Sequence, residues 1–111
     1  MEKFENIMKE IRQAVEVLAG TTVRKYKSEA LADAKKLLSS IQDDLKRWTK
    51  LLASGDITTA EYEWLIASYK EEAKMKSLEK AGLAISRIRQ FANSVLDTAV
   101  DVIFQKVLEK K

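Results

Sequence analysis

The chain has 111 residues, 46% apolar and 33% charged, with a net charge of +3, no Pro, no Cys, no His and only three Gly. This length suits one domain, residues 1–111, and the composition excludes collagen-like, low-complexity and disordered classes. Without His or Cys, the chain lacks the usual general base, the commonest metal ligand and a thiol nucleophile, so we expect neither an enzyme nor a cofactor.

The first half of the chain, residues 2–53, carries an apolar repeat of 11 residues. Its leading positions are Phe4, Val15, Tyr26, Leu37 and Trp48. Eleven residues over three turns is close to the natural helical period, so the stripe can follow a nearly straight helix. The repeat has the same phase on both sides of Gly20, which predicts one helix of about 50 residues, on the order of 75 Å long. A break near Gly20 is the alternative.

A turn is predicted at Ser54-Gly55-Asp56-Ile57-Thr58, in the middle of the chain. Gly55 can adopt the left-handed conformation that closes a helix. Thr58 and Glu61 have the spacing of a capping box, in which each side chain accepts a hydrogen bond from the other residue's backbone N–H. The two halves should therefore fold back on each other here.

The second half, residues 59–110, has an apolar stripe with small residues in its middle. In a hairpin that turns at residue 56, residues at the same height have numbers that add up to about 112. This register places Ala30 and Ala34 opposite Ala81 and Ser77, so small residues face small residues. A second break, at Gly82, is the alternative to a continuous helix.

Apolar residues widen to about half of the helix circumference between Phe91 and Val107. A helix that packs on one partner needs a stripe of little more than 100°. We therefore expect this face to be an interface between copies of the chain, a homodimer first of all. Its residues are Phe91, Val95, Ala99, Val102 and Ile103.

These features predict an all-α fold: a long antiparallel hairpin, about 2–53 and 59–110, that self-associates into a bundle. A compact four-helix bundle with breaks near Gly20 and Gly82 is the alternative. The hairpin predicts a structural or protein-interaction module rather than a catalyst.

Residues 45–69 contain the pattern L-x-x-W-x-x-L-L-A-S-G-D-I-T-x-x-E-Y around the predicted turn. This stretch resembles the helical hairpin of bacterial short C-terminal domains, in which a Gly-x-Ile-Thr-x-x-Glu-Phe turn joins two short helices. The resemblance implies a role in interaction or oligomerisation, and it brings no catalytic residues to this chain.

Basic residues gather in two segments, 24–36 and 74–89, that hold ten Lys and Arg against three Asp and Glu. The hairpin would bring these segments together into a basic band. Its members are Arg24, Lys25, Lys27, Lys35, Lys36, Lys74, Lys76, Lys80, Arg87 and Arg89. The competing function is therefore sequence-nonspecific binding of nucleic acid or another anionic surface.

Other chemistry has little support in the sequence. Asp97 and Asp101 share a helix face with Ser, Thr and Asn, which is typical of a solvated surface rather than an acid–base pair. Trp48 and Trp64 flank the turn and are expected to pack, Trp64 beside the core stripe. We expect no small-molecule substrate. No apolar run reaches the roughly 18 residues of a membrane span, and no signal peptide is apparent, so a cytoplasmic location is expected.

Overall fold

Five α-helices and one 3₁₀ helix form the structure, a computed structural model that describes residues 3–108. The predicted helix ends at residues 2, 109 and 110 lie outside that range. The helices are α1 (Phe4–Thr22), η1 (Arg24–Tyr26), α2 (Lys27–Ser54), α3 (Thr59–Glu72), α4 (Lys76–Ala81) and α5 (Ile85–Leu108). The all-α prediction is confirmed.

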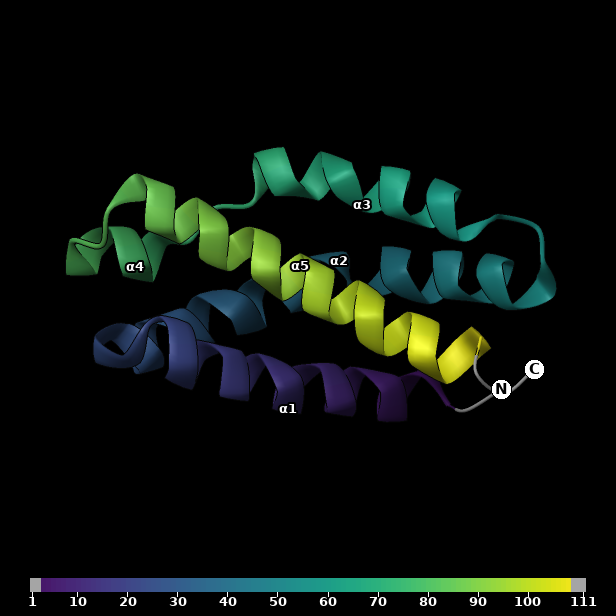
Figure 1. Ribbon diagram of the computed structural model, residues 1–111, viewed down its shortest axis with the longest axis horizontal. Coiled ribbons are helices and arrows are strands. Elements are labelled where there is room, and N and C mark those ends of the chain that lie inside the picture. Colours follow the sequence, from purple (N-terminus) through teal and green to yellow (C-terminus); the bar gives the residue numbers. More distant parts are fainter. Residues whose placement is uncertain (1–2, 109–111) are drawn as a thin grey trace.

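The helices pack as an antiparallel four-helix bundle, in which α3 and α4 lie one after the other and together take the place of the third helix (Figure 1). The molecule measures 43 × 23 × 19 Å and its radius of gyration is 14.0 Å. A helix of the predicted 50 residues would be on the order of 75 Å long, which these dimensions exclude. The compact four-helix bundle is therefore the arrangement that forms, and the two uninterrupted helices do not.

The central turn is confirmed in its local detail. Gly55 has a φ of +83°, and the Asp56 N–H donates to the Leu51 carbonyl at 2.8 Å, which closes α2. At the start of α3, the Glu61 N–H donates to the Thr58 hydroxyl at 3.1 Å and the Thr58 N–H donates to the Glu61 carboxylate at 3.0 Å. The capping box therefore fixes where α3 begins.

The predicted register around this turn is also present. Thr49 and Tyr62 share a buried hydrogen bond of 3.1 Å. Nearer the other end of α2, the Asp33 carboxylate accepts hydrogen bonds from the Leu78 N–H at 2.8 Å and the Ser77 N–H at 3.0 Å. In each pair the residue numbers add up to within two of the predicted 112.

The helix predicted over residues 2–53 is interrupted at Val23, where φ is −134° and ψ is 49°. The Thr22 hydroxyl donates to the Leu18 carbonyl at 2.7 Å, and such back-bonding bends or ends helices. Val23 is buried and anchors the bend, after which η1 leads into α2. The 11-residue repeat marks the side of α1 and α2 that faces the core: Phe4, Val15 and Leu37 are buried, and Tyr26 and Trp48 are half-buried.

Two further breaks divide the second half. Gly82, with a φ of +90°, ends α4 at the position predicted for the alternative fold. The chain also leaves the helix at residues 73–75, where no Gly or Pro is present and Met75 is fully buried. Asp33 fixes where the helix resumes, because its carboxylate accepts two hydrogen bonds from N–H groups at the start of α4.

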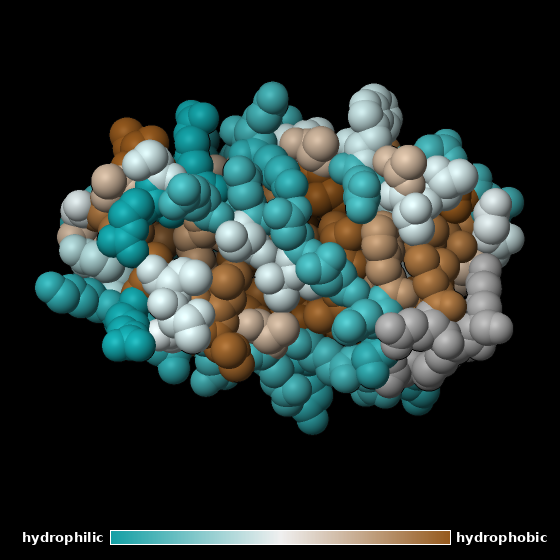
Figure 2. Space-filling view, viewed as in Figure 1, coloured by the Kyte–Doolittle hydropathy of each residue, from teal (hydrophilic) through white to brown (hydrophobic). Residues whose placement is uncertain are grey.

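The core runs along the whole bundle, and α5 lies against each of the other α-helices. Hydrophilic residues cover much of the face in Figure 2, and apolar residues show mainly between the helices. Phe91, Val95, Ala99 and Ile103 are buried inside the chain, and Val102 is half-buried. Packing within one chain thus explains the wide apolar face of α5, and self-association through that face stays a prediction.

Candidate anion-binding site

The two basic segments lie at one end of the bundle. The first half of α2 packs against α4, and the two Asp33 hydrogen bonds hold α4 in place. Asp33 is itself buried, so it does not place an exposed negative charge among the surrounding lysines. The predicted adjacency is therefore correct, although a bundle rather than a long hairpin produces it.

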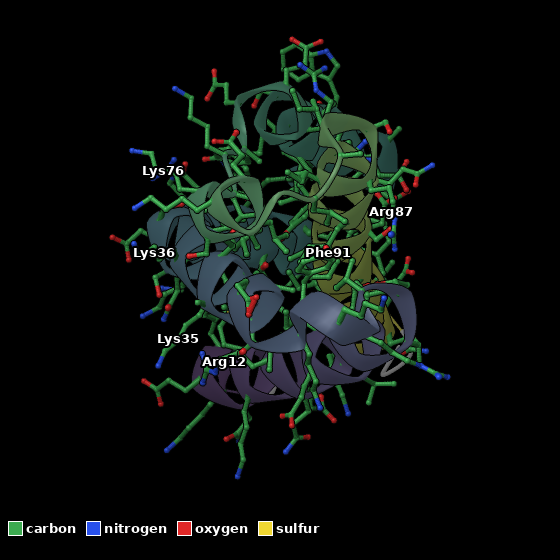
Figure 3. All side chains as sticks on the ribbon, turned by 90° about the vertical axis from the view of Figure 1, so that its left-hand side faces the viewer. Arg12, Lys35, Lys36, Lys76, Arg87 and Phe91 are labelled. Atoms are coloured by element: carbon green, nitrogen blue, oxygen red, sulfur yellow. The ribbon has the colours of Figure 1, made fainter. Side chains whose placement is uncertain are left out.

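Figure 3 shows Lys76, Lys36, Lys35 and Arg12 one below the other along one side of the molecule, on α4, α2 and α1. Lys74 belongs to the same surface, because it lines a hollow of about 330 Å³ together with Lys36. All five side chains are exposed. We call Arg12, Lys35, Lys36, Lys74 and Lys76 the basic face.

The remaining members of the predicted band are also exposed, and several of them lie on elements outside the basic face. Arg87 lies on the side opposite Lys76 and Lys36 in Figure 3, and it donates to the Thr22 carbonyl at 2.9 Å. That contact satisfies a carbonyl at the end of α1. The ten predicted residues thus do not form one continuous patch. Besides Arg87, the band members outside the basic face are Arg24 and Lys25 on η1, Lys27 at the start of α2, Lys80 on α4 and Arg89 on α5.

No side chain of the basic face forms a salt bridge within residues 3–108. The three salt bridges of this region join Arg47 to Asp44, Lys70 to Asp97 and Lys106 to Glu10. The carboxylates that line the hollows beside the basic face are Glu16 and Glu72. Five exposed cations therefore keep their charge available to a ligand.

The surface between these cations is shallow. Arg12 and Lys35 border a hollow of about 270 Å³ that is open to solvent and has Val15, Leu31 and Leu38 in its lining. Hollows of this kind do not enclose a small ligand, which normally buries most of its surface in a cleft. The arrangement suits a large, extended anion that lies across several helices.

The shifted titrations belong to a different part of the molecule. Burial raises the pKa of Tyr62 to about 12, and the Thr49 hydroxyl partly opposes this effect. Burial and the hydrogen bond to Asp44 raise the pKa of Tyr69 to about 12, and that same bond holds the pKa of Asp44 below its usual value. Trp48 packs against Tyr69, with ring centroids 5.9 Å apart and ring planes tilted by 35°. We read this cluster as packing that locks α2 to α3.

The two aspartates weighed as catalytic candidates, Asp97 and Asp101, line one open hollow of about 440 Å³ together with Glu63 and Lys70. Asp97 is exposed and pairs with Lys70 at 2.7 Å, and Asp101 is exposed beside it on α5. Among residues 3–108, no three His, Cys, Asp or Glu side chains are grouped as metal ligands would be.

In comparisons with known proteins, no family model, no curated protein and no solved structure matches this chain. Within the described part of the chain, no helix has the length and apolarity needed to cross a membrane. Any functional argument therefore depends on the surface itself.

Two features of this site could not be read from the sequence pattern. Arg12 was absent from the predicted band because α1 reaches the side of α2 only through the break at Val23. Asp33 was counted as an opposing charge, yet it caps α4. The predicted register places Asp33 close to Ser77, and this closeness was the sequence signal that could have indicated its role.

Proposed function

We propose that the protein is a non-enzymatic helical module that binds duplex nucleic acid through the phosphates, using its basic face, without reading the base sequence. The observation that carries this proposal is the set of five exposed cations, four on α1, α2 and α4 and Lys74 just before α4, that no carboxylate pairs with. Unpaired Lys and Arg side chains release counterions from a polyanion when they bind it, and this release supplies most of the nonspecific affinity.

The distribution of charge over the whole chain supports the same proposal. Segments 24–36 and 74–89 hold ten of the 20 basic residues but only three of the 17 acidic residues. The rest of the chain is therefore net acidic, although the protein as a whole carries +3. A charge separation of this kind orients the basic end toward an anionic partner during encounter.

A duplex fits the surface better than a single strand does. Single-strand binders stack bases on exposed aromatic rings. Tyr26, the aromatic residue within segment 24–36, is half-buried against the core, and none of the five cations has an exposed aromatic neighbour in the hollows it lines. Base edges are read by side chains of an element that enters a groove, and the basic face spans several helices instead.

The test compares two charge-reversal variants with equal net charge. One carries Lys35→Glu, Lys36→Glu and Lys76→Glu in the basic face. The other carries Lys9→Glu, Lys46→Glu and Lys50→Glu at exposed positions elsewhere, and in each set two of the substitutions fall on α2. Binding to a fluorescent duplex should weaken at least about tenfold in the first variant and much less in the second.

Salt dependence and a second ligand complete the experiment. With four or five phosphate contacts, wild-type affinity should fall roughly 150- to 500-fold between about 50 and 200 mM salt. Equal losses in the two variants would show that only net charge matters and would refute the basic face. Binding to anionic vesicles without binding to the duplex would refute nucleic acid as the ligand.

A further inference from the structure

A second surface, on the outer side of α3, has a different chemistry. Trp64 is 76% exposed and lines an open hollow of about 550 Å³ between α3 and α2. Trp48, Leu65 and Tyr69 line the same hollow and are half-buried. We call the surface formed by Trp48, Trp64, Leu65, Tyr69, Glu71 and Glu72 the aromatic hollow.

The exposure of Trp64 is unusual within this chain. The other large apolar side chains exposed in residues 3–108 are Val17 and Ile85, which do not line this hollow. Trp64 stands beside three half-buried apolar side chains of the same hollow, and Trp is among the residues enriched at the energetic centres of interfaces. Core packing does not explain Trp64, because Tyr62 and Ile66 already fill the inner face of α3.

Charge identifies the partner's chemistry. Glu71 and Glu72 are exposed at the edge of the hollow, and none of its lining residues is basic. Arg47, whose guanidinium carbon is 5.9 Å from the centroid of the Trp48 ring, is already paired with Asp44 at 2.6 Å. Lys70 points its ammonium at Asp97 on α5. Lysine or arginine side chains of a partner would form charge-assisted hydrogen bonds with these exposed carboxylates at the edge of the apolar surface.

We infer that the aromatic hollow docks a basic amphipathic helix of a protein partner, with an apolar side chain of that helix against Trp64 and its lysines or arginines at Glu71 and Glu72. A helix that lays its apolar face into a groove is a common mode of peptide recognition. A symmetric pair of copies is a poorer occupant, because a twofold interface would pair this surface with itself, and its lining has no basic residue to meet Glu71 and Glu72 of the other copy. This inference does not depend on the proposed binding of nucleic acid.

The probe is a designed amphipathic helix of about 18 residues, or five turns, built from Lys and Leu. A scrambled peptide of the same composition and a Glu/Leu peptide with the same pattern serve as controls. Calorimetry should show binding of the Lys/Leu helix, at least tenfold weaker binding of the scrambled peptide and no binding of the Glu/Leu helix.

Variants assign the binding to the hollow. Trp64→Ala should weaken binding of the Lys/Leu helix at least tenfold. Val17→Ala should leave it unchanged, because the Val17 side chain is 68% exposed but does not line the hollow. Glu71→Lys with Glu72→Lys should also weaken it. A Lys35→Glu, Lys76→Glu variant, which keeps Lys36 because Lys36 lines a hollow together with Glu72, should bind it undiminished, so this experiment is separate from the duplex test. Circular dichroism checks that each variant is folded.

Three results would overturn the inference. The first is equal affinity for the scrambled and patterned peptides, which would indicate charge attraction alone. The second is an unchanged affinity in Trp64→Ala. The third is a concentration-dependent dimer, seen by sedimentation of the wild type and lost in Trp64→Ala, which would assign the hollow to a second copy of the chain.

Discussion

Replacement of Asp33 tests how the basic face is built. Asp33 is 3% exposed, and its two carboxylate oxygens accept the Ser77 and Leu78 N–H groups at 3.0 and 2.8 Å. Asp33→Ala leaves both donors at the start of α4 without that partner. A lost helix cap costs about 0.5 to 2 kcal/mol, and a hydrogen bond to a charged acceptor contributes about 1.5 to 3. We therefore expect a loss of about 2 to 4 kcal/mol in the free energy of unfolding.

Thermal and urea denaturation followed by circular dichroism measure this loss. For a domain of this size, the expected fall in the thermal midpoint is roughly 10 to 20 °C. Asp33→Asn keeps one acceptor oxygen and should lose about half as much. Asp43→Ala, at an exposed position on the same helix, is the control and should change stability by less than about 0.5 kcal/mol.

Native-state hydrogen exchange adds a local readout, because the Ser77 and Leu78 amides should lose protection in Asp33→Ala. The reasoning is refuted if Asp33→Ala unfolds with the wild-type midpoint. It is also refuted if those two amides keep their protection, since α4 would then be held by packing alone.

Two further predictions concern backbone conformation and pH. Gly55→Ala forces an L side chain into a φ of +83° and should destabilise the fold by about 1 kcal/mol. Gly20→Ala lies inside α1, where the added Cβ would make only an ordinary contact with Lys27 at 3.7 Å, and should stabilise the fold by about 0.5 to 1 kcal/mol. Equal effects of the two substitutions in denaturation would contradict this reasoning. Burial raises the pKa of Tyr62 from 10.0 in the unfolded chain to about 12 in the folded protein. The stability that neutral Tyr62 contributes is therefore complete below pH 10, and about 2 to 3 kcal/mol of it is lost as the pH rises through 12. Tyr62→Phe should remove that part of the alkaline loss of stability, and an unchanged pH profile in this variant would refute the prediction.

Local signals in the sequence were sufficient for the centre of the fold. Gly55 and the pair Thr58 and Glu61 act through neighbouring backbone groups, so their chemistry could be read directly from the chain. The antiparallel register followed from the position of that turn, and with it the closeness of α2 and α4.

The breaks at Val23 and at residues 73–75 were harder to predict than the central turn. Helical periodicity describes each helix but says nothing about where one helix stops, so the repeat across Val23 was compatible with both folds. After residues 73–75 the helix resumes where Asp33 caps it, and Asp33 lies more than 40 positions away in sequence. The position of Arg12 beside Lys35 and the exposure of Trp64 follow from how the helices pack. The predicted basic band therefore lacked Arg12, and the aromatic hollow was not predicted.

The most direct test of the proposed function is an NMR titration of the isotope-labelled protein with a short duplex at low salt. We expect the largest amide shifts around Arg12, Lys35, Lys36 and Lys76, with the Trp64 indole signal unmoved. Shifts centred on α3, or spread evenly over all the helices, would contradict the assignment of phosphate binding to the basic face.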